Sequence, residues 1–125
     1  MKKIEVTVEK TSTGYSAYAN KLSVATTGSD VNEIRKNMLE ALNLLFEDEG
    51  VRVKLSDISF RIDLQQFFTF YNVINAKGLA QRINMNYTLL NQYIQGKKTP
   101  SPKQVRKIMI GIHEVGRELS RAVLV

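Results

Sequence analysis

The chain has 125 residues, of which 43% are hydrophobic and 24% are charged, a balance typical of a folded protein rather than of a disordered segment. It contains no cysteine and one histidine, so we expect no disulfide bond, no metal site and no cofactor. No apolar run approaches the roughly 20 residues that span a bilayer, and the N-terminus leads into a strand pattern rather than a signal segment. The expected location is therefore the cytoplasm, with no membrane partner.

The positive charge lies in the second half of the chain. The protein carries 18 Lys+Arg and 12 Asp+Glu, a net charge of +6, yet residues 1–62 hold nine side chains of each sign. Residues 63–125 hold nine basic and three acidic side chains, and no carboxylate occurs between Asp63 and Glu114. Such an excess attracts polyanions, so a nucleic acid or an acidic protein is a candidate partner for this half.

Three short strand patterns open the chain. Residues 3–9 alternate strictly between apolar and polar side chains, which is typical of a half-buried strand. A polar break at 11–14 contains a glycine and predicts a hairpin turn, after which residues 15–19 alternate again. Residues 22–27 are rich in β-branched side chains and predict a third strand.

A helix and one or two further strands are expected next. Asp30 and Glu33 form a capping box, apolar residues then recur at helical spacing, and Gly50 is expected to stop the helix. The stretches 51–55 and 58–62 alternate in the manner of strands. The first half therefore predicts an α+β fold in which one helix packs on a small antiparallel sheet.

The second half shows helical spacing throughout. Asp63 opens a helix, and two short helical stretches follow at 76–83 and 87–95. Ser101 as N-cap and Pro102 at the first helical position predict the start of a longer final helix. This half is expected to be all-α.

We therefore predict two domains, an α+β domain over residues 1–62 and a helical domain over residues 63–125. Each is near the size at which a single core is only marginally stable, so a homodimer or higher homo-oligomer is expected. Apolar positions on the final helix, among them Val115, Leu119 and Val123, are candidates for a dimer face.

Residues 79–100, with the sequence LAQRINMNYTLLNQYIQGKKTP, have the spacing of a helix-turn-helix. Ala80 is small enough to let two helices approach closely. Asn84 occupies the turn position that favours a left-handed backbone, which Asn tolerates better than other non-glycine residues. Asn86 is placed to cap the second helix.

Polar side chains occupy the outward face of that second helix. Asn and Gln can bind adenine edges bidentately, Thr or Tyr can meet a thymine methyl or a phosphate, and lysines suit phosphates. An ordinary helical hairpin can show similar spacing, so the argument for DNA depends on the carboxylate-free face and the Gly-Lys-Lys exit. The predicted contacts to double-stranded operator DNA are Asn86, Tyr87, Thr88, Asn91, Gln92, Gln95, Lys97 and Lys98.

Two resemblances to known families rest on these residues. The segment 76–121 resembles the Xre/Cro-like helix-turn-helix family. The stretch GYSAY, the strand and turn at 24–28 and the helix residues 32–42 resemble the HicB antitoxin family. Members of that family join a partial RNase H-like N-terminal domain to a DNA-binding domain. The resemblance implies an antitoxin that binds a small RNA-cleaving toxin, HicA, and represses its own operon.

Three functions are weighed. The leading one is a transcriptional repressor that acts as the antitoxin of a toxin–antitoxin pair. The second is a stand-alone helix-turn-helix regulator whose N-terminal domain binds another ligand or protein, and the third is an adaptor that docks an acidic partner. An enzyme is not expected and no catalytic residue is assigned, because the carboxylates of the first half show no metal-binding spacing and no nucleophile or phosphate-binding glycine motif occurs.

Overall fold

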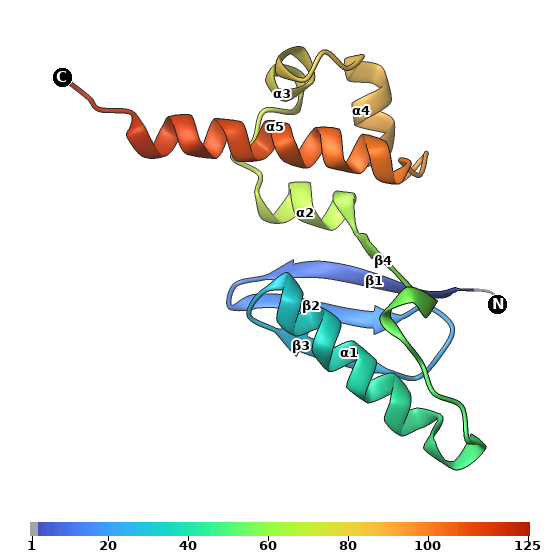
Figure 1. Cartoon of the computed structure of the whole chain (residues 1–125). Helices are drawn as coiled ribbons and strands as arrows, with labels where there is room; N and C mark the ends of the chain where they lie inside the picture. Colours follow the sequence, from blue (N-terminus) through green and yellow to red (C-terminus); the bar gives the residue numbers. More distant parts are fainter. Residues whose placement is uncertain (1–2) are drawn as a thin grey trace. The chain divides into compact units, whose positions relative to one another are not determined.

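The computed structural model describes residues 3–125, and the chain divides into two compact units (Figure 1). The first unit ends at Phe70 and the second begins at Tyr71. The change of sequence period placed the boundary earlier, after Ile62. The structure therefore assigns helix α2 (Leu64–Phe70) to the first unit.

A side chain of α2 ties that helix to the first strand. The Gln66 side-chain oxygen accepts from the backbone N–H of Lys10 at 2.9 Å, and its amide nitrogen donates to the Lys10 carbonyl at 2.7 Å. Asp63 caps the helix by accepting from the backbone N–H of Gln66 at 3.1 Å, as its place in the sequence predicted. The Gln66 side chain therefore pairs with the backbone of the first strand at Lys10. The change of sequence period at residue 62 does not reveal this contact.

The first unit has an α+β fold in which α1 packs on a four-stranded sheet and α2 follows the last strand of that sheet (Figure 1). The strand order is β3-β2-β1-β4. The elements are β1 (Ile4–Thr11), β2 (Gly14–Ala19), β3 (Ala25–Gly28), α1 (Val31–Leu45) and β4 (Ile58–Ile62).

The sheet is mixed, and the prediction of an antiparallel sheet is wrong for its last strand. β1 pairs antiparallel with β2, and β2 with β3, but β4 pairs parallel with β1. Ile4 lies opposite Ile58, and Val8 lies opposite Ile62. The cause is α1, because a helix between two strands returns the chain so that the second strand can run parallel to its neighbour.

The strand alternation places the core between the sheet and α1. Asp30 begins the helix as predicted, with its carboxylate accepting from the backbone N–H of Glu33 at 2.8 Å. Side chains of both layers are then removed from water, which supplies the main stabilisation of the unit. The buried residues are Val6, Val8, Ala17, Ala19, Ile34, Met38, Leu42, Val53 and Ile58.

The strand predicted at 51–55 is absent. Val53 is buried, yet its N–H donates to the Asn43 side-chain oxygen at 2.7 Å and its carbonyl accepts from the Asn43 amide nitrogen at 3.1 Å. One asparagine side chain therefore satisfies the backbone groups that a strand neighbour would otherwise pair. A short 3-10 turn, η2 (Leu55–Asp57), leads into β4.

The predicted end of α1 and the predicted start of β3 differ from the observed ones by a few residues. Gly50 was expected to stop α1, but α1 ends at Leu45 and Gly50 instead ends the short turn η1 (Glu47–Glu49). Its φ of 68° is the left-handed conformation that glycine adopts without steric cost. The third strand begins at Ala25, later than the predicted residue 22.

The second unit is helical, as predicted, and consists of α3 (Ala76–Arg82), α4 (Tyr87–Ile94) and α5 (Pro102–Arg121). Ser101 caps α5 through the backbone N–H of Gln104 at 3.2 Å, with Pro102 in the first turn. Figure 1 shows α3 and α4 on the same side of α5. Their buried residues are Leu79, Ala80, Leu90, Tyr93, Ile108 and Gly111. In the part of the chain that the structure describes, no helix has the length and apolarity needed to cross a membrane.

Candidate nucleic-acid interface

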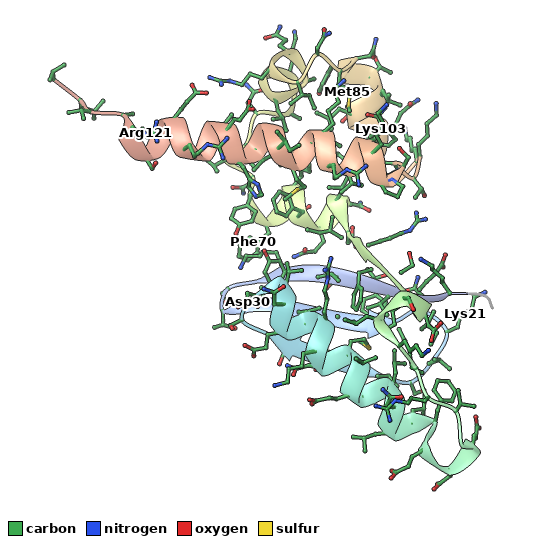
Figure 2. All side chains as sticks on the ribbon, viewed as in Figure 1. Lys21, Asp30, Phe70, Met85, Lys103 and Arg121 are labelled. Atoms are coloured by element: carbon green, nitrogen blue, oxygen red, sulfur yellow. The ribbon has the colours of Figure 1, made fainter. Side chains whose placement is uncertain are left out.

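The turn between α3 and α4 is closed by the hydrogen bonds of a left-handed helix cap. Asn84 has a φ of 54°, the left-handed conformation that the sequence predicted for it. Its N–H donates to the Gln81 carbonyl at 3.3 Å, and the Met85 N–H donates to the Ala80 carbonyl at 2.9 Å. This is a Schellman motif, and its last residue, Met85 (Figure 2), is buried. The motif fixes the direction in which α4 leaves the turn.

Both ends of α4 are also capped. The Asn86 side-chain oxygen accepts from the Leu89 N–H at 3.3 Å, which confirms the predicted cap. At the other end Gly96 has a φ of 75°, and the N–H groups of Lys97 and Lys98 donate to the Gln92 carbonyl at 2.9 and 3.2 Å. The two lysines are therefore held against the C-terminal end of α4 rather than on a free loop.

The predicted DNA-contact residues lie on or next to α4, and none of them is buried. Leu90 and Tyr93 form the inward face of the helix. Asn91 and Gln92 are half-buried. The predicted contact residues that are exposed are Asn86, Tyr87, Thr88, Gln95, Lys97 and Lys98. All eight therefore lie on α4, at its caps or directly after it.

Capping limits what Asn86 can do. Its side-chain oxygen already accepts from the backbone of α4, so the cap uses one of the two lone pairs and fixes the orientation of the amide. Bidentate binding of adenine needs both a donor and an acceptor. We therefore assign Asn86 a structural role first, which leaves Asn91, Gln92 and Gln95 as the amides of this set that are free of a capping role.

One cation of the basic half is neutralised. The Arg82 guanidinium donates to both carboxylate oxygens of Glu118, at 2.7 and 3.2 Å. This hydrogen bonding, followed by the opposite charge, raises the pKa of Arg82 and lowers the pKa of Glu118 from their ordinary values. Arg82 had been counted in the basic excess, and its pairing removes it from the charges directly offered to a polyanion.

A second basic feature lies on α5, and its residues were predicted as part of the basic excess but not as DNA contacts. Lys103, Arg106 and Lys107 share one face of α5 and line a groove of about 790 Å³ beside the α3–α4 turn. The Lys107 ammonium donates to the Asn84 carbonyl at 3.4 Å. The signal was present in the sequence, because residues three and four apart lie on one helix face.

Within residues 3–125, no group of three or more His, Cys, Asp or Glu side chains is placed to hold a metal ion. Tyr15 is half-buried against the core, whereas Tyr18, three residues later on the other face of β2, is 42% exposed. Tyr18 is therefore the aromatic side chain of that strand that a partner could reach.

Comparisons with models of known protein families, with curated proteins and with solved structures find no match.

Proposed function

We propose that the protein binds double-stranded DNA through α4 and acts as a transcriptional repressor. The observation that supports this proposal is the outward face of α4, which carries accessible amide, hydroxyl and phenol groups on a helix capped at both ends. α4 contains no carboxylate that would repel phosphate. An α-helix fits the major groove of B-DNA, which is about 12 Å wide.

The proposed roles divide between bases and phosphates. Asn91 and Gln92 bind base edges, Tyr87 and Thr88 contact thymine methyl groups or phosphates, and the exposed Gln95 extends the same face. Lys97 and Lys98, at the end of α4, bind phosphates and set the position of the helix along the duplex. The charge of the second half supplies the long-range attraction that brings DNA to this surface.

We further propose that this repressor is an antitoxin. In this proposal the first unit binds a small RNA-cleaving toxin stoichiometrically and without catalysis, in the cytoplasm, and the complex represses its own operon. The supporting residues are those of the HicB resemblance, which form β2, β3 and α1 of the first unit. The first unit also has a net charge near zero and an exposed aromatic side chain, Tyr18. Both features suit a surface that binds a protein partner.

Two substitutions test the DNA proposal by fluorescence anisotropy on a labelled duplex from the upstream region of the gene. Asn91→Ala should weaken binding by about 1–3 kcal/mol at its target base and relax the preference at that position. Lys97→Ala should weaken all sequences alike and reduce the salt slope by about one unit. Lys36→Ala, an exposed lysine on α1, is the matched control and should leave binding unchanged. Unchanged binding by both α4 variants would show that α4 is not the reading helix.

Co-expression tests the antitoxin proposal separately. We expect one short reading frame next to the gene to arrest growth when expressed alone, and this protein to restore growth when co-expressed. DNA binding without any such rescue would favour the stand-alone regulator, whose first unit binds another ligand. Failure of both DNA binding and rescue would favour the adaptor.

A further inference from the structure

The groove beside the α3–α4 turn carries three cations that take no part in the contacts proposed for α4. Arg106 and Lys107 follow Lys103 by three and four residues, so the three share one face of α5, and all of them are exposed. Figure 2 shows Lys103 at the beginning of that helix. The groove has a volume of about 790 Å³. Positive charge gathered in such a hollow attracts anions.

The charges of these three cations are available to a ligand. Within residues 3–125, none of the three forms an ion pair. Glu114 also lines the groove, but it lies about two helical turns beyond Lys107, roughly 10 Å along α5. Arg82, at the same end as Glu114, is held by Glu118 at 2.7 Å. The start of α5 is therefore the positive end of the groove, and the dipole of this 20-residue helix adds to it.

The groove lies next to the start of α4. Asn84 is part of its lining, and the Asn84 carbonyl accepts from the Lys107 ammonium at 3.4 Å. Asn84 precedes Asn86, the N-cap of α4, by two residues. Lys97 and Lys98 follow the other end of the helix. Because α4 has eight residues, about 12 Å of helix separates Lys107 from these two lysines.

This separation suits duplex DNA. The major groove of B-DNA is about 12 Å wide and has a phosphate backbone along each side. Lys97 and Lys98 alone would bind phosphates at the end of α4 and leave those near its start without a cation. The groove on α5 supplies cations at that place. Arg106 can bind a phosphate through two guanidinium N–H groups, and the two lysines of the groove can bind as point charges.

We propose that this groove binds backbone phosphates of the duplex that α4 reads, and that these phosphates are distinct from those at Lys97 and Lys98. The carboxylates of an acidic protein would also satisfy the three cations. The place of the groove favours phosphates, because a duplex held on α4 brings its backbone to the start of that helix. The inference rests on the proposed DNA binding and adds residues that position α4 without reading bases.

Removal of two cations together tests the proposal by fluorescence anisotropy. Lys103→Ala with Arg106→Ala should weaken binding of the upstream duplex and of a random-sequence duplex by the same factor. The slope of log affinity against log salt concentration should become shallower by about two units, since each lost phosphate contact removes about 0.9. The matched control is Arg117→Ala with Arg121→Ala, which removes the same charge from the same helix outside this groove. This control should leave the slope nearly unchanged, and far-UV circular dichroism should show equal helix content in all chains.

Lys107 is tested separately, because its ammonium also bonds to the Asn84 carbonyl. Lys107→Ala should make the salt slope shallower by about one unit, and Lys107→Arg, which keeps the charge, should restore it. A purely structural role in the turn would instead lower the midpoint of thermal unfolding of Lys107→Ala and leave the salt slope unchanged. That result would remove Lys107 from the phosphate site.

The outcomes distinguish this inference from the proposed function. Suppose that Lys97→Ala weakens binding while Lys103→Ala with Arg106→Ala keeps the affinity and salt slope of the natural chain. The groove is then not a phosphate site, although α4 still binds DNA. An equal change of slope in the control with Arg117 and Arg121 replaced would also overturn the inference, because net charge would explain the effect. Binding of no duplex by the natural chain would overturn both the inference and the proposed function.

Discussion

At the scale of single residues, the sequence predicts the caps well. Asp30, Asn86 and Ser101 each accept a backbone N–H at the helix start where their residue type and spacing placed them. These interactions are local, so three or four residues of sequence contain all the information. The Gln66 bridge to Lys10 was not predictable, because its two residues are far apart in the chain and meet only in the folded unit.

Substitutions of Asn84 test the left-handed backbone conformation of the turn between α3 and α4. Its φ of 54° is costly for residues with a Cβ atom, by about 1–2 kcal/mol, and least costly for glycine. We expect Asn84→Gly to be at least as stable as the natural protein, Asn84→Ala to be less stable, and Asn84→Val to lose about 1–2 kcal/mol. Urea unfolding followed by circular dichroism measures the series. A valine variant as stable as the natural protein would show that the turn is not left-handed at this position.

At the scale of elements, periodicity predicts each α-helix and strand of the described structure, but it also predicts a strand at 51–55 that is absent. That stretch alternates like a strand, but alternation reports only which side chains are buried, not how the backbone is paired. Val53 is buried as the pattern indicates, while Asn43 on α1 takes the hydrogen bonds of its backbone. The parallel direction of β4 was missed for a related reason, since strand direction depends on the route of the connecting chain.

Asn43→Ala tests whether the Asn43 side chain takes the place of a neighbouring strand at Val53. The change removes both hydrogen bonds to the backbone of Val53, which is 2% exposed, and leaves buried polar groups unpaired. We expect a loss of about 1–3 kcal/mol in the free energy of unfolding. Asn32→Ala, at an exposed position on the same helix, is the control and should change stability much less. Equal effects of the two changes would argue against a structural role for Asn43.

At the scale of the whole molecule, composition and period predicted two units, but not the side of the boundary on which α2 lies. Its apolar residues, Leu64, Phe67 and Phe68, have helical spacing like the rest of the second half. Their pattern therefore indicated a helix without indicating the unit to which the helix belongs. The candidate interface was more predictable, because its residues follow one another along α4 and its caps.

Two fragments test the boundary. A fragment ending at Phe70 should unfold at a higher temperature than one ending at Ile62, because only the longer one keeps the hydrogen bonds between Gln66 and Lys10. The Lys10 ammonium also lies 5.6 Å from the centre of the Phe70 ring, a contact that the shorter fragment lacks. Thermal unfolding by circular dichroism gives the comparison. Equal midpoints would return the boundary to residue 62.

The central claim is that α4 reads the sequence of a DNA duplex. Selection of bound duplexes from a random-sequence pool, with the natural chain and Asn91→Ala in parallel, tests it without knowledge of the operator. We expect a defined motif bound roughly a thousandfold or more tightly than random duplex at physiological salt, with the preference lost at one position in the variant. Enrichment of no motif, or the same motif from both proteins, would contradict the claim.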